Sequence, residues 1–311
     1  MTTLVVERPG IDHLGRDCTV RELVASVIRT ATAELMTRES ALRENGDPED
    51  VHKTRVATRR LRAQLRTLRP VLQRPWVDDV NRELKWLAAV LGRIRDADVL
   101  FEALQRQVRT LPEADVAPAR ALIARLLTAR EAANADLLVA LQSDRYRALV
   151  VRLDAAGDAP PMGAGDGRAD AAARSVLPSL VAQPWRGLHK RVRALGGDPS
   201  DESLHEVRKR AKKLRYSSET AVPVMGKPAK RLATAAERLQ SVLGEVHDAA
   251  TAETWLRHEI LADGGLSVAL VGGELIERER RRHQANRKRW PKAWKKAQKK
   301  SLRRWLHGGG H

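Results

Sequence analysis

The chain has 311 residues, with 57 Lys and Arg against 39 Asp and Glu, so its formal net charge is +18 and its isoelectric point is about 10.8. Such an excess predicts a polyanionic partner, and the length allows one large or two ordinary domains. A single cysteine, Cys18, excludes an intramolecular disulfide framework. Since neither a signal peptide nor an apolar run of the ~18 residues needed to span a membrane is found, we expect a soluble, cytoplasmic protein without a membrane role.

The sequence is rich in Leu, Ala, Arg and Glu and has no stretch that alternates with a period of two, which predicts an all-α fold. Turn-forming residues separate the expected helices. The segments Asn45-Gly46-Asp47-Pro48 and Gly196-Gly197-Asp198-Pro199 each precede a strongly basic helix. Helices are expected over residues 18–44, 49–74, 78–108, 114–152, 173–195, 201–221, 228–262 and 268–306.

The stretch from Asp154 to Asp170 is rich in Gly, Pro, Ala and Asp and is the one obvious linker. It divides the chain into a first half over residues 1–153, a flexible linker over 154–172 and a second half over 173–311. Each half then carries about four helices, the number needed to close a bundle around its own core.

Two motifs occur in both halves. The segment His52-Lys-Thr-Arg55-Val-Ala-Thr-Arg59-Arg60-Leu61-Arg62 returns 153 residues later as His205-Glu-Val-Arg208-Lys-Arg-Ala-Lys212-Lys213-Leu214-Arg215. The block Leu91-Gly92-Arg-Ile-Arg95-Asp96 returns 152 residues later as Leu243-Gly244-Glu-Val-His247-Asp248. Two independent motifs at nearly one offset indicate an internal repeat.

On a helical wheel, both copies of the first motif place a cationic stripe roughly a quarter-turn from a stripe of core leucines. One reading is a solvated basic face. Against it, neighbouring like charges destabilise an isolated helix, and an anion bound in both halves would offset that cost. Phosphate oxygens suit guanidinium groups, and histidine adds a donor. The stripes consist of His52, Arg55, Arg59, Arg62 and Arg66, and of His205, Arg208, Lys212 and Arg215; additional candidates are Arg60, Lys209, Lys213 and Arg95.

The paired His-x-x-Arg-x-x-x-basic-basic-Leu-Arg segments, each followed by Leu-Gly-x-x-[Arg/His]-Asp, resemble the CHAD family, the conserved histidine α-helical domain. This resemblance implies two four-helix bundles related by a pseudo-twofold axis, with a basic pocket or channel between them. It also implies binding of inorganic polyphosphate and association with polyphosphate granules. The halves are not equivalent, because Glu219 stands where the first half has Arg66. The Glu-x-Glu-x-Lys mark of the CYTH domain, often fused to this family, is absent.

Three alternatives remain open. Nucleic acid is the main rival because charge alone does not distinguish phosphate polymers, although the stripes lack aromatic residues for stacking, apart from Tyr216. A metal-dependent enzyme acting on polyphosphate is a weaker alternative, because Asp96 and Asp248 read better as ion-pairing acids. We therefore expect no catalytic residues, no metal site and no cofactor.

The basic C-terminal segment carries three tryptophans on one face, Trp290, Trp294 and Trp305. We expect this face to pack into the core, and the alternative is that the segment makes a second contact with a polyanion.

Overall fold

The computed structural model describes residues 14–44, 47–164, 167–263 and 265–307, and this part of the chain is helical with no β-strand. The predicted all-α class is therefore confirmed. The N-terminal residues, in which no signal peptide was found, lie outside the described residues, as do Asn45 and Gly46. No described helix combines the length and the apolar composition that crossing a bilayer would require.

The helices fall into two groups on either side of a non-helical connection. The first group is α1 (Val20–Glu44), α2 (Pro48–Leu68), the 3₁₀ turn η2 (Arg69–Val71), α3 (Arg74–Val108), α4 (Glu113–Gln142) and α5 (Asp144–Asp158). The second is α6 (Ala173–Arg193), α7 (Asp201–Met225), α8 (Lys227–Asp263), α9 (Leu266–Arg287), α10 (Trp290–Ala297) and the 3₁₀ turns η3 (Lys300–Leu302) and η4 (Arg304–His307).

Two of the expected helices are each divided, so the prediction of eight helices was wrong. Residues 114–152 form α4 and α5, because Ser143 takes an extended backbone and its hydroxyl caps α5 by accepting from the Tyr146 amide. Residues 268–306 divide between α9 and α10, which restarts with Pro291 in its first turn. Helix α7 passes through Pro223 and ends at Gly226, whose φ of 63° only glycine adopts readily.

The connection between the halves is tied to the first half by backbone hydrogen bonds. Its start, residues 154–158, belongs to α5. Further along, the Gly163 amide donates to the Val71 carbonyl at 3.0 Å, and the Ala173 amide donates to the Cys18 carbonyl at 2.8 Å. The predicted division at 153 and 173, and the flexibility of the linker, remain predictions.

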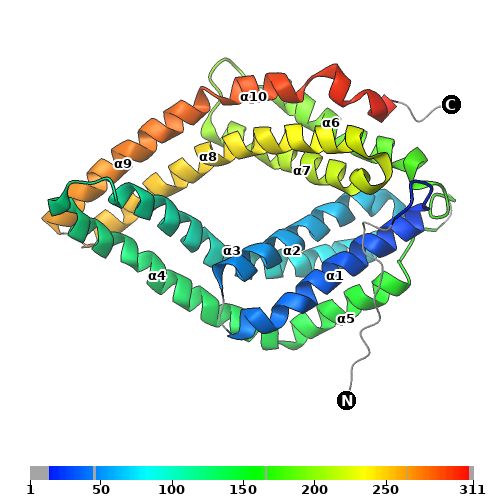
Figure 1. The fold of residues 1–311 in the computed structure, drawn as a ribbon, viewed down its shortest axis with the longest axis horizontal. Helices are drawn as coiled ribbons and strands as arrows, with labels where there is room; N and C mark the ends of the chain where they lie inside the picture. The colour runs from blue at the N-terminus through cyan, green and yellow to red at the C-terminus, as the bar shows by residue number, and fades with distance from the viewer. Residues whose placement is uncertain (1–13, 45–46, 165–166, 264, 308–311) are drawn as a thin grey trace.

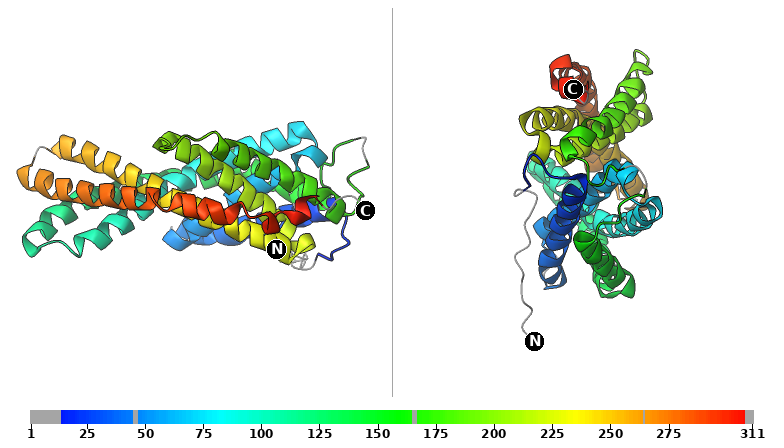
Figure 2. Two further views of the ribbon diagram at one scale, coloured as in Figure 1. Left: turned by 90° about the horizontal axis from the view of Figure 1, so that it is seen from above. Right: turned by 90° about the vertical axis from the view of Figure 1, so that its right-hand side faces the viewer.

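The helices outline a diamond (Figure 1). One hydrophobic cluster runs from α1 through η4. It contains leucines of α2 and α7, the two signature helices that carry the repeated His/Arg motif, including Leu61, Leu65 and Leu214. A second, smaller cluster lies at one tip, where the ends of α3 and α4 pack with α8 and α9 through residues such as Leu104, Leu122 and Leu275. Viewed from above, the molecule is elongated, with this tip at one end (Figure 2).

The two signature helices, α2 and α7, pack against each other. The hydroxyls of Thr67 on α2 and Ser217 on α7 share a buried hydrogen bond of 2.7 Å, so small polar side chains occupy this contact. Both helices begin with side-chain caps: Asp47 accepts from the Glu49 amide at 2.7 Å, and Ser200 accepts from the Ser203 amide at 3.2 Å. The cationic stripes therefore project from two helices that are fixed relative to one another.

Candidate functional site

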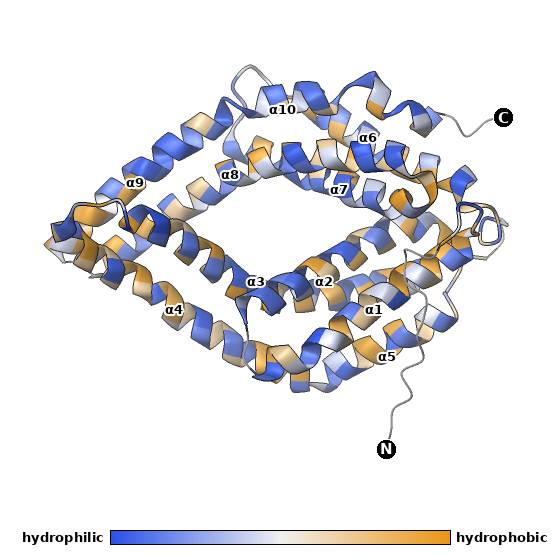
Figure 3. Ribbon diagram, in the orientation of Figure 1, coloured by the Kyte–Doolittle hydropathy of each residue, from blue (hydrophilic) through white to orange (hydrophobic). Residues whose placement is uncertain are grey.

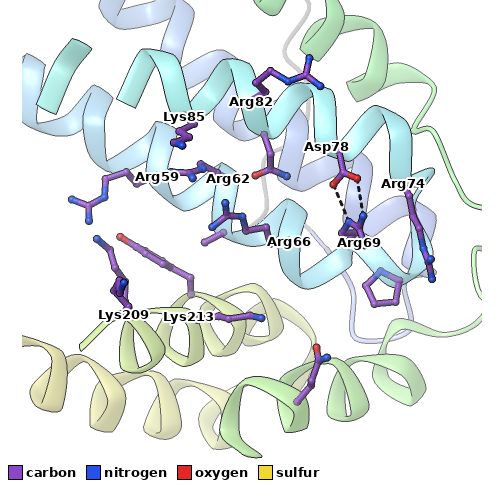
Figure 4. Close-up of a pocket in the computed structure, with 16 residues that line it drawn as sticks. Arg59, Arg62, Arg66, Arg69, Arg74, Asp78, Arg82, Lys85, Lys209 and Lys213 are labelled. Carbon is purple, nitrogen blue, oxygen red and sulfur yellow. Dashed lines mark hydrogen bonds and ion pairs between the residues drawn. The ribbon is translucent and has the colours of Figure 1, made fainter. Parts of the chain in front are cut away.

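A basic pocket of about 1130 Å³ lies between the signature helices and the start of α3. Ten of its lining residues are Lys or Arg, and Asp78 is the one acidic residue among them. Figure 4 shows basic residues of α2, η2 and α3 on one side of the pocket and of α7 on the other. These cations are Arg59, Arg62, Arg66, Arg69, Arg74, Arg82, Lys85, Lys209, Lys212 and Lys213.

The α2 wall consists of predicted stripe residues without acidic partners. Among the described residues, none of Arg59, Arg62 and Arg66 has a carboxylate within the 4.0 Å of an ion pair. Burial lowers the pKa of Arg59 and of Arg62, and the neighbouring Arg66 guanidinium lowers that of Arg62 further. Because both guanidinium groups stay charged, their burial beside like charges is unfavourable until an anion arrives.

The α7 wall differs from the predicted stripe. Lys212 lines the pocket together with Lys209 and Lys213, whereas Arg208 and Arg215 do not. On the helical wheel, Lys209 and Lys213 lie about 60° and 100° beyond Lys212 on one side, and Arg208 and Arg215 lie about 40° and 60° away on the other. The pocket faces the first side. Lys213 has a lowered pKa, caused by burial and then by Arg66 across the pocket.

Four further pocket cations come from η2 and α3: Arg69, which continues the first cationic stripe on the helical wheel, and three on α3 that were not among the sequence candidates. Arg69 pairs with Asp78 at 2.7 Å, and Arg82 pairs with Asp79 at 2.8 Å. Arg74 and Lys85 complete the group. The positions 74, 78, 82 and 85 recur at helical spacing, which is a signal in the sequence, but nothing in the sequence shows that this face of α3 turns toward α2 and α7.

The first two basic residues of each stripe lie outside the pocket lining. Arg55 pairs with Asp96 at 3.0 Å, so Asp96 acts as the ion-pairing acid expected. The repeated Leu-Gly block lies beside these arginines: a Cβ on Gly92 would lie 3.8 Å from Arg55 Nε, and one on Gly244 would lie 3.5 Å from Arg208 Nε, both within ordinary van der Waals contact. In both halves, a guanidinium group therefore packs against the bare backbone of the following long helix.

The histidines of the two motifs are partly buried and incompletely bonded. Neither His52 Nδ1 nor His205 Nδ1 has a hydrogen-bond partner in the described structure. The rings of His205 and His247 lie 4.5 Å apart, centroid to centroid. Burial lowers the pKa of both His52 and His205; Arg95 lowers that of His52 further, and His247 that of His205. These rings are neutral at pH 7 and become donors on both nitrogens in acid.

The remaining candidates are engaged in ion pairs away from the pocket. Arg215 contacts Glu219 at 2.7 Å and Glu237 of α8 at 2.9 Å. Arg60 lies 3.7 Å from the same Glu219, and Arg95 pairs with Glu102 at 3.3 Å. Direct carboxylate partners make these three cations less available to a ligand than the unpaired arginines of α2.

The tryptophans of the C-terminal segment pack into the protein, as predicted. Trp294 is buried and stacks on Trp185 with ring centroids 5.9 Å apart. Trp290 and Trp305 are partly buried against the main hydrophobic cluster. The lysines of this segment consequently face away from the core.

No group of three or more His, Cys, Asp and Glu side chains converges in the described part of the chain. Asp98, two residues after Asp96, pairs with Arg130 at 2.7 Å. Asp248 is partly buried, and its burial raises the pKa of its carboxyl group. The ten cations of the pocket offer multivalent contacts to an anion through guanidinium and ammonium groups.

An all-helical fold with two His/Arg helices beside a basic pocket defines the class of protein structurally as an all-α helical domain with a cationic pocket. The CHAD domain profile matches residues 26–257, and the chain belongs to this family. The fold is similar to that of PptA from Streptomyces chartreusis, with a TM-score of 0.71 and 23% identity over 89% of this chain and 99% of that one. It is also similar to the CHAD domain from the plant Ricinus communis, with a TM-score of 0.68 and 22% identity over 95% and 94% of the two chains.

Among curated proteins, the chain is similar to an uncharacterized protein of Mycobacterium tuberculosis, Rv2226, and to its counterpart in a second strain. The identity is 31% over 223 residues, which is 68% of this chain. The matched stretch spans 40% of the length of these relatives.

Proposed function

We propose that the protein binds inorganic polyphosphate in the basic pocket between α2 and α7. The observation that supports this most directly is the α2 wall, where three arginines lack any acidic partner among the described residues and face the lysines of α7 across a preformed pocket. An unbranched chain with a charge at every phosphate can contact both walls at once. Guanidinium groups hold phosphate oxygens with two parallel hydrogen bonds, and the lysines add mobile point charges.

The pocket suits a polymer without bases better than nucleic acid. Tyr216 is its only aromatic lining residue, and it is nearly buried on α7. Single-stranded nucleic acid is usually held by several aromatic side chains on which successive bases stack. We therefore propose that the pocket selects polyphosphate over nucleic acid by the higher density of negative charge along the polyphosphate chain.

Displacement of fluorescent polyphosphate at near-physiological salt tests this selectivity. We expect unlabelled polyphosphate to displace the probe at far lower phosphate concentration than transfer RNA, single-stranded DNA or heparin. Equal displacement by DNA would instead indicate a general polyanion-binding protein of the nucleic-acid class.

We further propose that the protein is a binding protein and not an enzyme, and that it acts in the cytoplasm on polyphosphate granules, an association that the family resemblance implies. Incubation with polyphosphate and Mg²⁺ or Mn²⁺ is expected to release no orthophosphate, because the acids considered as ligands serve as ion-pair partners or, like Asp248, stand beside basic side chains. Orthophosphate release that Asp96→Ala or Asp248→Ala abolishes would assign these carboxylates a catalytic role.

Affinity for polyphosphate is expected to rise as pH falls. Histidines with an ordinary pKa of 6.5 would charge between about pH 8 and pH 6. Because burial lowers the pKa of His52 and His205 in the free protein, the rise extends to lower pH than it would for histidines with an ordinary pKa. The double variant His52→Asn, His205→Asn should show a flatter profile in fluorescence titrations. An unchanged profile would show that the charge of these histidines, which lie outside the pocket lining, does not contribute to binding.

A further inference from the structure

A second basic groove lies on the outer side of the second half, between α8 and the C-terminal segment. Its volume is about 1000 Å³. One wall is a row on α8 that consists of Lys227, Lys230, Arg231 and Arg238. The other wall consists of Arg289, Lys292, Lys296 and Lys299. None of its lining residues belongs to the central pocket, which α2, η2, α3, α6 and α7 form.

The charge of this groove is uncompensated. All eight cations are exposed, and none has a carboxylate within 4.0 Å in the described part of the chain. The adjoining helix α9 shows the opposite pattern, because each of its arginines forms an ion pair with a carboxylate. For example, Arg281 pairs with Glu277 at 2.8 Å, and Arg287 pairs with Asp198 at 2.6 Å. After Glu279 the sequence contains no acidic residue. Eight facing like charges repel one another unless a polyanion lies between them.

The groove is preformed, because its two walls are fixed by packing and not by their charges. On α8, the cations recur at spacings of three, one and seven residues, so they share one side of the helix. On α10, Trp294 and Ala297 are buried in the core. Lys292 and Lys296 lie on another side of this helix and line the groove opposite α8. Helix α10 runs beside α8 (Figure 1). Hydrophilic residues predominate along α9 and α10 (Figure 3).

The lining chemistry favours a phosphate polymer without bases. None of the described residues that line the groove is aromatic, so it lacks the aromatic side chains on which successive nucleobases usually stack. Its floor consists of short side chains, namely Thr234, Ala235, Val242, Ala293 and Leu302. Five of its eight cations are lysines, whose compact charges on flexible stems adapt to a ligand that has no fixed register.

We propose that the groove between α8 and α10 is a second polyphosphate-binding site, separate from the central pocket; the identity of the polymer rests on the proposed function. A long chain could then be held at two places on one molecule, so that the second contact is intramolecular and the apparent affinity exceeds that of either site. A chain too short to reach from one site to the other would bind independently at each.

Isothermal titration calorimetry with short-chain polyphosphate tests the proposal on the full chain. The wild-type protein is expected to bind two ligands. The groove variant Lys230→Gln, Arg238→Gln, Lys292→Gln, Lys296→Gln should bind one. Its matched control removes four exposed cations that already have acidic partners and should still bind two: Arg147→Gln, Arg174→Gln, Arg257→Gln, Arg281→Gln. Circular dichroism melting should be similar for all three proteins.

A central variant, Arg59→Gln, Arg62→Gln, Lys212→Gln, distinguishes this inference from the proposed function. It should retain one site, and that site should be lost when the groove substitutions are added. A stoichiometry of one in the wild-type protein that falls to zero in the central variant, or of two in the groove variant, would overturn the groove assignment while leaving the central site intact. Two sites in the central variant would overturn the central site alone. Displacement from the central variant by poly-glutamate at lower charge concentration than by polyphosphate would reassign the groove to an acidic protein partner.

Discussion

The double variant Arg59→Ala, Lys212→Ala is expected to bind polyphosphate at least about 30-fold more weakly than the wild-type protein. Each residue supplies one charge-assisted contact, from opposite walls of the pocket, and such contacts contribute about 1–3 kcal/mol when partly desolvated. Removing Arg59 also relieves a buried cation whose pKa is lowered by burial and by Arg208 nearby. Thermal stability should therefore be unchanged or slightly higher.

The matched control for this variant is Arg147→Ala, Arg281→Ala. Both residues are exposed and paired with acids within their own helices, and the net charge changes by the same amount. We expect at most a small loss of affinity in fluorescence polarisation titrations, through the reduced overall charge. If the control loses as much affinity as the pocket variant, net charge and not the pocket governs binding.

Salt is expected to weaken binding steeply. A ligand that engages about five cations and behaves as a single strand should show a slope of log affinity against log salt of roughly −3.5, or a loss of roughly 100-fold between 50 and 200 mM salt. The slope should be shallower in the double variant, because two of the contacts are gone. A slope near zero would contradict binding by charge pairing, and titrations at four or five salt concentrations suffice to measure it.

Much of the fold follows from the sequence because its repeat is strong. The offset between His52 and His205 identified the two signature helices, and helical periodicity identified the core face that contains Leu61 and Leu214. The helix ends were less predictable. The interruption at Ser143 depends on a cap that competes with a long run of good helix formers, and Pro223 is accommodated within α7 where the sequence suggested an end.

The sequence predicted those features of the site that depend on which residues share one face of a single helix. The wheel of α2 placed Arg59, Arg62 and Arg66 on one face, and these three line the pocket together. What the wheel could not show is how neighbouring helices rotate. Arg215 turns toward Glu237, which follows 22 residues later on another helix, and Lys85 enters the pocket from α3. Both contacts join different helices, so periodicity within one helix carries no information about them; the pair of Arg215 with Glu219, four residues later on α7, could by contrast be read from the sequence.

The same argument explains the C-terminal segment. Its run of positive charge was evident, but the charge became a groove only through its pairing with the row on α8. Spacing identified the tryptophan face as the packed one, and Trp294 on Trp185 confirms it. The partner row at Lys227, Lys230 and Arg238 lies more than fifty residues earlier and has no distinguishing motif.

The most direct test of the central claim is a crystal structure of the protein with short-chain polyphosphate. We predict phosphate density between α2 and α7, with oxygens within hydrogen-bonding distance of Arg59, Arg62 and Arg66 on one wall and of Lys212 and Lys213 on the other. Density confined to the outer groove, or to surfaces that leave the three arginines without an anion, would contradict the account.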